Sequence, residues 1–301
     1  MKRLSASLYF AANTLALLLI AGCVTQNEMK TQRSPLISAL EHEMLTNTNW
    51  LRVHAAEGLL DNGESRNIVE LFQPEADTAT APYRIGVWRI LARATSGDER
   101  NRYIERIRAV MRDPQAVDRV SAAESIGKLN AASRADRDFI SRWLESADDA
   151  TAPFPRWLMV LSSNASERDN EEAALAKLLS SKDPVARLRA AFALGRMKTL
   201  SADSIARFRQ QLQVEPPASI ARVYLITALL LHVLDASTIS ALEKELVPYL
   251  KNGRANEQLE VGISAGLRGH KDDLKFLSPL LNNPEPDARI GAVNGMLRLL
   301  K

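Results

Sequence analysis

The chain has 301 residues, 46% of them hydrophobic, with 39 Lys and Arg against 36 Asp and Glu and a single cysteine. One cysteine excludes an intramolecular disulfide and a metal site made of several thiolates, so an apolar core must stabilise the fold. Basic and acidic residues are interleaved, and no basic tract contains interspersed aromatic residues. The sequence therefore gives no support to nucleic-acid binding.

The first 22 residues have the three-part order of a secretory signal peptide. Lys2 and Arg3 form a cationic start, and an uncharged, mostly apolar stretch follows from residue 4 to residue 22. This stretch is marginal for a permanent membrane span, which needs ~20 apolar residues. We therefore exclude residues 1–22 from the fold. Lys2 and Arg3 leave with this segment, so 37 basic and 36 acidic residues remain, a net charge of +1.

The motif Ile20-Ala21-Gly22-Cys23 resembles the lipobox of bacterial lipoproteins. The resemblance implies that the Cys23 thiol receives a diacylglycerol and that the chain is cut before Cys23. It also implies that the new amino group is acylated, for example with palmitate. Added acyl chains turn marginal membrane binding into a stable anchor. The alternatives are an uncleaved anchor and a plain signal peptide with an incidental cysteine. We expect the lipidated tether to span residues 23–33.

The residues after Cys23 bear on the membrane that would hold the lipid. Val24 and Thr25 stand there, whereas an Asp just after the cysteine commonly signals inner-membrane retention in Gram-negative lipoproteins. The absence of Asp resembles outer-membrane sorting. For a Gram-negative host, the resemblance implies a lipid-anchored envelope protein on the periplasmic face of the outer membrane.

A sequence pattern recurs at intervals of 31 to 37 residues from residue 49 to the end of the chain. Each copy has an Arg, or in one copy a Gln, followed by an apolar residue, a variable residue and a small or apolar pair. Apolar residues stand mostly at offsets one, three, four and seven from this anchor, which predicts one stripe of a helix rather than a strand. The anchors are Arg52, Arg84, Arg119, Arg156, Arg187, Arg222, Gln258 and Arg289.

A second helical segment precedes each anchor, and proline often stands between the two, where it suits a first helical turn. Two antiparallel helices in each unit of this length predict a stack of helical hairpins. No Val- and Thr-rich alternating run predicts a strand. The preceding helices are expected over residues 36–45, 66–72, 102–111, 137–144, 172–179, 204–212, 238–250 and 272–281.

Residues 183–195, which read DPVARLRAAFALG, closely resemble the second helix of a HEAT repeat of the bacterial HEAT-like type. Residues 113–127 and 286–297 are similar. The resemblance covers residues 34–301 and implies an all-α fold, a right-handed α-solenoid of about eight HEAT-like hairpins. In this family the second helices line the concave side. HEAT-like proteins bind many unrelated partners, so the fold alone names no function.

One motif resembles the nucleophile elbow of serine hydrolases, because Gly262, Ser264 and Gly266 are spaced as G-x-S-x-G. The elbow requires a strand, a sharp turn and a helix, whereas this motif falls inside a predicted helix. Gly266 stands at offset eight of its repeat, as Gly127 and Gly195 do in theirs, where a close neighbour requires room. We therefore expect a packing role for these glycines and no catalytic residue.

The four histidines lack the HExxH spacing of zinc sites. His42, between two glutamates, could bind a metal weakly, although an exposed helical histidine is the commoner explanation. The acidic pairs at residues 148–149 and 272–273 lie at expected helix starts, where carboxylates cap helices and interact favourably with the helix dipole. No Gly-rich phosphate loop is present. We predict no metal site, no cofactor and no enzymatic activity.

Offsets two, five and nine of the second helices should point away from the core stripe, toward the concave side. Most of these residues are polar or small, but the fourth to sixth repeats carry apolar residues with cations beside them. An exposed patch of this kind often marks a contact with a protein or a ligand. The alternative is that packing between helices covers these side chains. The candidate residues are Leu158, Leu161, Arg189, Phe192, Arg196, Tyr224 and Leu231.

The row of anchor arginines has two interpretations, a ligand-binding row or a set of pairs with acidic residues of the neighbouring repeat. We favour pairing, in which each surface-grade pair contributes only ~0.2–1 kcal/mol. Taken together, the residues predict a lipid-anchored envelope scaffold that binds another protein on its concave face. Its client could be an envelope assembly, a secretion or pilus channel, or a cell-wall enzyme. The alternative function is an accessory subunit of a periplasmic enzyme or transporter.

Overall fold

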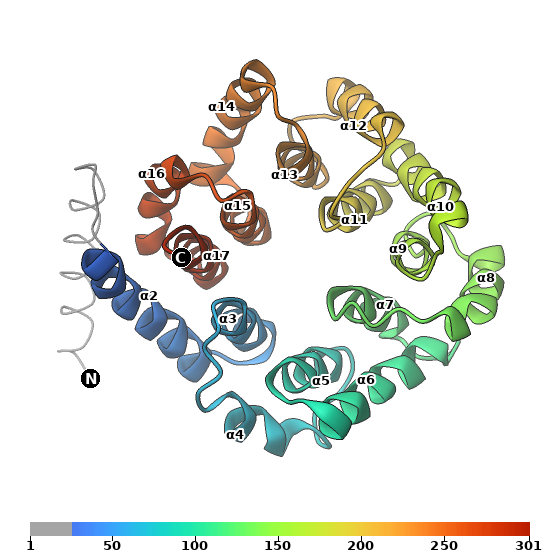
Figure 1. Cartoon of the computed structure of the whole chain (residues 1–301), viewed down its shortest axis with the longest axis horizontal. Helices are drawn as coiled ribbons and strands as arrows, with labels where there is room; N and C mark the ends of the chain where they lie inside the picture. The colour runs from blue at the N-terminus through green and yellow to red at the C-terminus, as the bar shows by residue number, and fades with distance from the viewer. Residues whose placement is uncertain (1–25) are drawn as a thin grey trace. The chain divides into compact units, whose positions relative to one another are not determined.

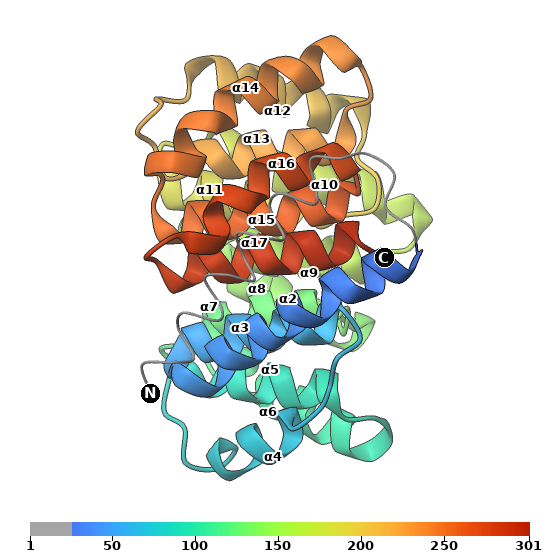
Figure 2. The same cartoon turned by 90° about the vertical axis from the view of Figure 1, so that its left-hand side faces the viewer.

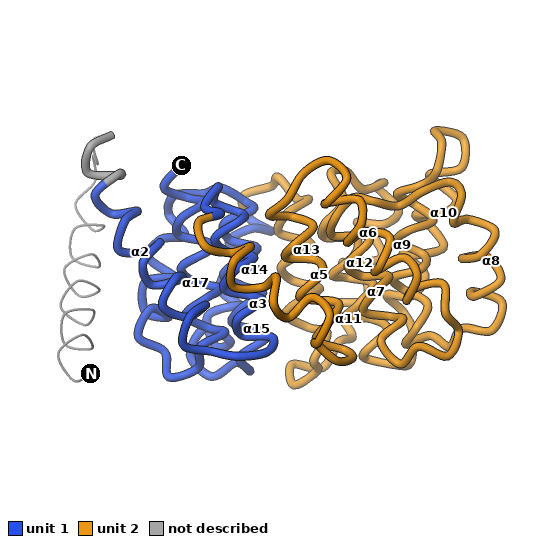
Figure 3. Tube along the Cα trace, turned by 90° about the horizontal axis from the view of Figure 1, so that it is seen from below, with its two compact units in different colours: residues 1–65, 237–301 blue, residues 66–236 orange. Residues whose placement is uncertain are grey.

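The computed structural model describes residues 26–301, with side chains from residue 31 onward. Cys23, the signal segment 1–22 and the start of the expected tether lie outside the described residues. Within residues 26–301 every regular element is a helix and no strand occurs, which confirms the all-α prediction. The chain divides into two compact units (Figure 3): unit 1 combines the chain up to Ser65 with Ser237–Lys301, and unit 2 is Arg66–Ala236.

The helices of unit 2 form two layers (Figure 1). The layer that we call the inner layer consists of α5 (Tyr83–Ala94), α7 (Arg119–Lys128), α9 (Pro153–Leu161), α11 (Pro184–Gly195) and α13 (Arg222–His232). Each of its helices packs against the next one. The outer layer consists of α4 (Ile68–Phe72), α6 (Gly97–Arg112), α8 (Arg137–Ser146), α10 (Ala165–Lys177) and α12 (Ala202–Val214). Short 3-10 segments at Gln73–Glu75, Arg134–Asp136 and Leu178–Ser180 complete the unit.

The inner helices begin where the sequence places them. In α11, Pro184 occupies the first turn, and the Asp183 carboxylate accepts a hydrogen bond from the Val185 amide (2.7 Å), which caps the helix. The residues at offsets three, four and seven, Ala190, Ala191 and Leu194, are fully buried. The predicted helical stripe is therefore the core side of α11.

Unit 1 consists of α2 (Gln26–Thr46), α3 (Asn49–Asp61), α14 (Ala236–Asn252), α15 (Ala255–Arg268), α16 (Leu274–Leu277) and α17 (Pro286–Leu299). The predicted helix over residues 272–281 is largely replaced by 3-10 segments, Lys271–Asp273 and Ser278–Asn282, around the single turn of α16. Pro279 explains the second of these segments, because proline lacks an amide hydrogen and its ring clashes with an α-helix interior.

The first and last helices within residues 26–301 pack together in unit 1, a contact that the repeat pattern does not predict. Figure 2 shows α17 beside α2 and α3, and α17 contacts both. The buried amides of Asn62 and Asn294 are joined by a hydrogen bond (3.0 Å), and Arg298 forms an ion pair with Asp61 (2.8 Å). We call this contact between α17 and the hairpin α2–α3 the terminal contact.

The terminal contact includes residues that were expected to be a tether. Helix α2 begins at Gln26, inside the expected tether 23–33. Gln32 is only 5% exposed, and Arg33 Nη1 donates a hydrogen bond to the carbonyl oxygen of Leu297 (2.7 Å). The packed part of the chain therefore begins before residue 34, because Gln32 is buried and Arg33 bonds to α17.

Helices α15 and α17 approach each other backbone to backbone. A Cβ added at Gly262 would lie 2.2 Å from the carbonyl carbon of Gly291, and one added at Gly295 would lie 2.2 Å from the carbonyl oxygen of Gly262. At Gly266 an added Cβ would lie 2.8 Å from the Cα of Gly295. Only glycine permits this approach, so the two glycines of the G-x-S-x-G motif have a packing role.

Candidate functional site

The seven candidate contact residues all lie on three consecutive helices of the inner layer, but they are not equally accessible. Leu158 on α9 is 1% exposed and Tyr224 on α13 is 9% exposed, so both belong to the core. The prediction that these two side chains form a contact surface is wrong. The reason is visible in α13, where every residue from Val223 to Leu230 is buried, as expected of a helix that is apolar on all sides.

The other five candidates are half-buried and leave part of their surface accessible; they are Leu161, Arg189, Phe192, Arg196 and Leu231. Phe192 is their centre. Its ring lies edge-on to the rings of Phe154 and Trp157, with centroids 6.2 and 6.3 Å away. The Arg196 guanidinium lies 4.5 Å from the Phe192 centroid, and Lys128 Nζ lies 5.6 Å from it. Lys128, Phe154, Trp157, Phe192 and Arg196 together are named the Phe192 cluster.

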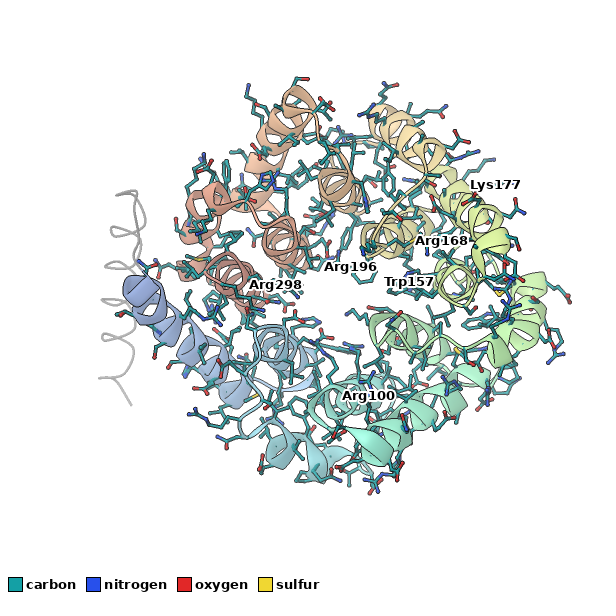
Figure 4. The ribbon with its side chains drawn as sticks, in the orientation of Figure 1. Arg100, Trp157, Arg168, Lys177, Arg196 and Arg298 are labelled. Carbon is teal, nitrogen blue, oxygen red and sulfur yellow. The ribbon has the colours of Figure 1, made fainter. Side chains whose placement is uncertain are left out.

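Figure 4 shows Trp157 on α9 and Arg196 after the end of α11, both on the inner-layer side of unit 2. Trp157 is 2% exposed and packs on Gly127, where an added Cβ would lie 2.3 Å from the indole ring. Gly195 similarly faces Ala228, whose Cβ is 3.0 Å away from an added Cβ. The room predicted at offset eight is therefore filled by the next inner helix. The Trp157 indole nitrogen has no hydrogen-bond partner among the described atoms.

Arg189 lies beside the Phe192 cluster and extends its cationic side. Its guanidinium lies 5.7 Å from the Phe154 centroid, and Nη1 donates a hydrogen bond to the Ala150 carbonyl oxygen (2.5 Å). Burial lowers the pKa of Arg189, and the nearby carboxylates of Glu124 and Asp183 oppose that shift. The side chain stays a cation at neutral pH because an arginine pKa lies far above 7.

The inward offsets of the inner layer carry an excess of positive charge. At offsets two, five and nine of α5, α7 and α11 the only acid is Glu124, which pairs with Lys128 (3.2 Å). Such an excess favours an acidic partner and raises its rate of association. The cations at these offsets are Arg89, Arg93, Lys128, Arg189 and Arg196; Arg89 is buried at 2% exposure and donates a hydrogen bond to the Ser125 hydroxyl (2.7 Å), so it does not face a partner.

Three anchor arginines pair with an acid of another hairpin, as favoured from the sequence; one is Arg289, which pairs with Glu43 (2.6 Å). Arg84 forms two hydrogen bonds to Asp118 (2.8 and 3.0 Å), and Arg187 forms two to Glu215 (both 2.7 Å). Although burial raises the pKa of Glu215, hydrogen bonds from Arg187, Ser219 and Gln211 lower it by more, so the net shift is downward. The anchors on α11 and α5 therefore join neighbouring hairpins through ion pairs.

Other anchors bind backbone carbonyl groups near their own helix, which the sequence does not predict. Arg52 donates to Asn47 O (3.1 Å), Arg119 to Met111 O (2.9 Å), and Gln258 to Leu250 O (2.9 Å). Arg119 also lies 3.8 Å from the centroid of Trp143. These contacts fix the turns before α3, α7 and α15, so packing accounts for these anchors without a ligand.

The hydrolase-like motif does not form a nucleophile elbow. Ser264 lies inside α15, is 5% exposed, and donates its hydroxyl hydrogen to Glu260 Oε1 (2.9 Å). The strand and sharp turn that expose a nucleophile in an elbow are not present here, because residues 255–268 form one continuous helix.

The candidate acidic and histidine positions have structural partners. The Asp148 carboxylate accepts hydrogen bonds from the Thr151 hydroxyl (2.6 Å) and amide (2.8 Å), and these bonds lower the pKa of Asp148. Asp273 pairs with Arg268 rather than capping a helix. His42 is exposed, and His54 Nδ1 lies 2.7 Å from Asp287 Oδ1 in the terminal contact. No group of three or more possible metal ligands occurs within residues 26–301.

Comparison of the chain with protein-family models and with curated proteins gave no match. None of the helices in the part of the chain that the structure describes is both long enough and apolar enough to cross a membrane. The Phe192 cluster and its surrounding charges are therefore the basis on which a function is proposed.

The sequence did not single out Lys128, Phe154 or Trp157 as members of the candidate site. Phe154 and Trp157 are almost buried, at 5% and 2% exposure, and they orient Phe192 rather than present their own surface. The sequence offers no distinguishing signal for them, because the matching stretch of α5 also carries two large rings, Tyr83 and Trp88.

Proposed function

We propose that this protein is a lipid-anchored adaptor of the cell envelope that binds an acidic, apolar segment of another protein at the Phe192 cluster. The observation that carries the proposal is a half-buried phenylalanine held by two rings and accompanied by the cations of Arg196 and Lys128. Aromatic residues and arginine dominate the energetic hot spots of protein interfaces. A chain in this role has no catalytic residue, metal or cofactor of its own.

We propose a right-handed HEAT-like α-solenoid of about eight hairpins as the fold that presents this surface. Support comes from eight anchors at a regular spacing and from the sequential packing of α5, α7, α9, α11 and α13. The ion pairs between an anchor arginine and an acid of the next hairpin also support it. In such a fold the inner layer lines the concave face. The Phe192 cluster would then lie on that face, at its centre of positive charge.

The proposed partner chemistry follows from charge and shape. Arg189 lies on α11 three residues before Phe192, and Arg196 follows the end of α11 four residues after Phe192, so a bound segment would meet an aromatic ring flanked by two cations. Leu161 and Leu231 offer apolar surface on the two adjacent inner helices. An aspartate- or glutamate-containing segment with one large apolar side chain matches this arrangement.

The lipid anchor, placed on Cys23 by the lipobox resemblance, gives the adaptor its place on the periplasmic face of the outer membrane. Restricting a protein to a thin layer raises its effective concentration toward a partner in or near the same membrane. A Cys23→Ser variant should therefore remain soluble after cell disruption and lose most partner capture in cells. The purified variant should still bind the partner as the wild type does, because the Phe192 cluster is unchanged.

In-cell photo-crosslinking tests the binding site. A crosslinking amino acid is placed at Leu161 or Leu231, with Arg142 on α8 and Lys177 on α10 as control positions; both controls are exposed residues of the outer layer. One dominant adduct from Leu161 and Leu231 that disappears in a Phe192→Ser background is the expected result. Equal labelling from the outer layer would contradict the site. Identification of the adduct as an enzyme or transporter subunit would favour the accessory-subunit alternative.

A further inference from the structure

The direction of helix α2 identifies one edge of unit 1 as the edge nearest to the lipid anchor. Near its start, α2 contacts the end of α17 through Arg33 and Leu297 O (2.7 Å). Near its end, Glu43 pairs with Arg289 at the start of α17 (2.6 Å). The two helices therefore run in opposite directions, and the start of α2 lies at the edge where α17 ends.

The ends of α3 and α15 lie at this same edge. Lys301 Nζ donates a hydrogen bond to Asp61 O at the end of α3 (2.8 Å). An added Cβ at Gly266 would lie 2.9 Å from Arg298 Cδ, which places the end of α15 beside the end of α17. We call the edge formed by Arg33, residues 61–65, 267–271 and 298–301 the anchor edge.

We propose that the anchor edge faces the lipid bilayer; this inference rests on the proposed lipidation of Cys23. Three residues separate Cys23 from Gln26, a reach of about 10 Å in any conformation. Helix α2 rises about 1.5 Å per residue, so Gln26 lies about 10 Å beyond Arg33 and away from Asn47. A chain that ran straight back from Gln26 toward Asn47 would bring Cys23 only level with Arg33, at the anchor edge. Asn47 marks the opposite edge, about 20 Å further along α2.

The composition of the anchor edge suits a membrane surface. Leu267 is 40% exposed there, and Lys271 and Lys301 are exposed. Lysines near a membrane attract anionic headgroups, and a leucine at the interface adds apolar contact. The opposite edge also carries an exposed leucine, Leu45, and the exposed cations Lys251 and Arg254, so the position of the anchor, not the composition, distinguishes the two edges. Contact with lipid through the anchor edge would fix the orientation of unit 1 on the membrane.

Depth-dependent fluorescence quenching tests the orientation. The lipidated full-length protein is reconstituted into vesicles of phosphatidylethanolamine and phosphatidylglycerol, with a second cysteine for attachment of a fluorophore. Ser65→Cys and Lys271→Cys place it at the anchor edge, and Leu45→Cys and Asn282→Cys place it at the opposite edge; all four positions are exposed. Because acylation blocks Cys23 in the anchored protein, the label attaches only to the added cysteine.

The expected result is several-fold stronger quenching by headgroup spin-labelled lipid at Ser65 and Lys271 than at Leu45 and Asn282. Equal quenching at the two edges, or stronger quenching at the opposite edge, would overturn the proposed orientation. Flotation with the vesicles is measured on the same samples. Protein that floats but shows no edge preference contradicts the orientation alone, whereas protein that fails to float contradicts the lipid anchor and the orientation with it.

Discussion

Arg289 in α17 forms an ion pair with Glu43 in α2, with 2.6 Å between Nη2 and Oε1. Arg289 is an anchor of the repeat, and the pair resembles the contact of Arg187 with Glu215, in which the acid belongs to the following hairpin. The first hairpin thus takes the place of the hairpin that would follow α17. The same type of side-chain contact joins neighbours along the chain and joins its two ends within unit 1.

Breaking this pair should loosen unit 1. Glu43 is nearly buried and Arg289 is partly exposed, so we expect Arg289→Ala to lower the free energy of unfolding by about 1–3 kcal/mol, the cost of an unsatisfied buried acceptor. Hydrogen exchange should speed up in α2, α3 and α17. The control is Arg209→Ala, because Arg209 and Asp235 form an exposed pair at 3.5 Å. An equal loss of stability in both variants would contradict a special role for the terminal pair.

Adding a methyl group between α15 and α17 should destabilise unit 1 strongly. In Gly262→Ala the new Cβ would meet the Gly291 backbone at 2.2 Å, which cannot be relieved by a side-chain rotation. We expect a loss of roughly 1–3 kcal/mol or more in the free energy of unfolding, measured by urea denaturation.

Gly58→Ala on α3 is the matched control, since its nearest contact is a flexible Leu40 methyl at 3.1 Å. The higher helix propensity of Ala, about 1 kcal/mol, should offset much of that contact. If Gly262→Ala proved as mild as Gly58→Ala, the close approach of α15 and α17 would be wrong. Ser264→Ala should cost about 1 kcal/mol, because it removes the hydrogen bond to the buried Glu260 carboxylate.

Phe192 and Tyr224 should respond differently to the same substitution. Phe192 is half-buried, so Phe192→Ser should weaken partner capture by about 2 kcal/mol, roughly thirtyfold in affinity, with little loss of helicity. Tyr224 is 9% exposed, and Tyr224→Ser should cost about 3–5 kcal/mol of stability. Thermal unfolding followed by circular dichroism, beside a binding assay with the crosslinked partner, separates the two effects. Loss of helicity in Phe192→Ser would show that it is a core residue.

The ion pair between Glu215 and Arg187 predicts a loss of stability in acid. Because the pKa of Glu215 is lower in the folded chain than the usual 4.5, the carboxylate stabilises the fold above about pH 4.5. That contribution declines as the pH falls through the folded pKa. Urea midpoints of the wild type and Glu215→Gln should therefore differ at pH 7 and converge as the pH falls through the folded pKa of Glu215, which lies below 4.5. Glu285→Gln, an exposed control, should follow the wild type; a constant difference between wild type and Glu215→Gln would contradict the prediction.

The helices of the inner layer were predictable because their pattern is local. The apolar stripe of α11 and the proline and Asp cap at its start are all contained in a dozen residues. The exposed surface was predicted less well. The use of offsets two, five and nine assumes that the second helix of each hairpin has one exposed face. Helix α13 is covered on all sides, and its unbroken apolar run from Val223 to Leu230 was the signal for that.

The terminal contact could not be predicted from the repeat. Residues such as Asn62 and Asn294 lie 232 positions apart, and no periodic pattern links them. Asn294 gives a partial signal, since it is the one strongly polar residue in the buried run from Ile290 to Leu297. A lone buried amide requires a hydrogen-bond partner, but the sequence does not say that the partner comes from the opposite end of the chain.

The composition of unit 1 from two distant segments sets the order in which the chain can fold. Synthesis completes α2 and α3 before unit 2, yet these helices bury Leu36, Leu40 and Met44 in a unit that also needs residues 237–301. Loop closure over the whole of residues 66–236 must precede their burial. Unit 2 is one continuous segment and can fold as soon as its residues are available. The apolar face of α2 and α3 stays exposed until α17 is present, and a chaperone that prevents aggregation would be required during that time.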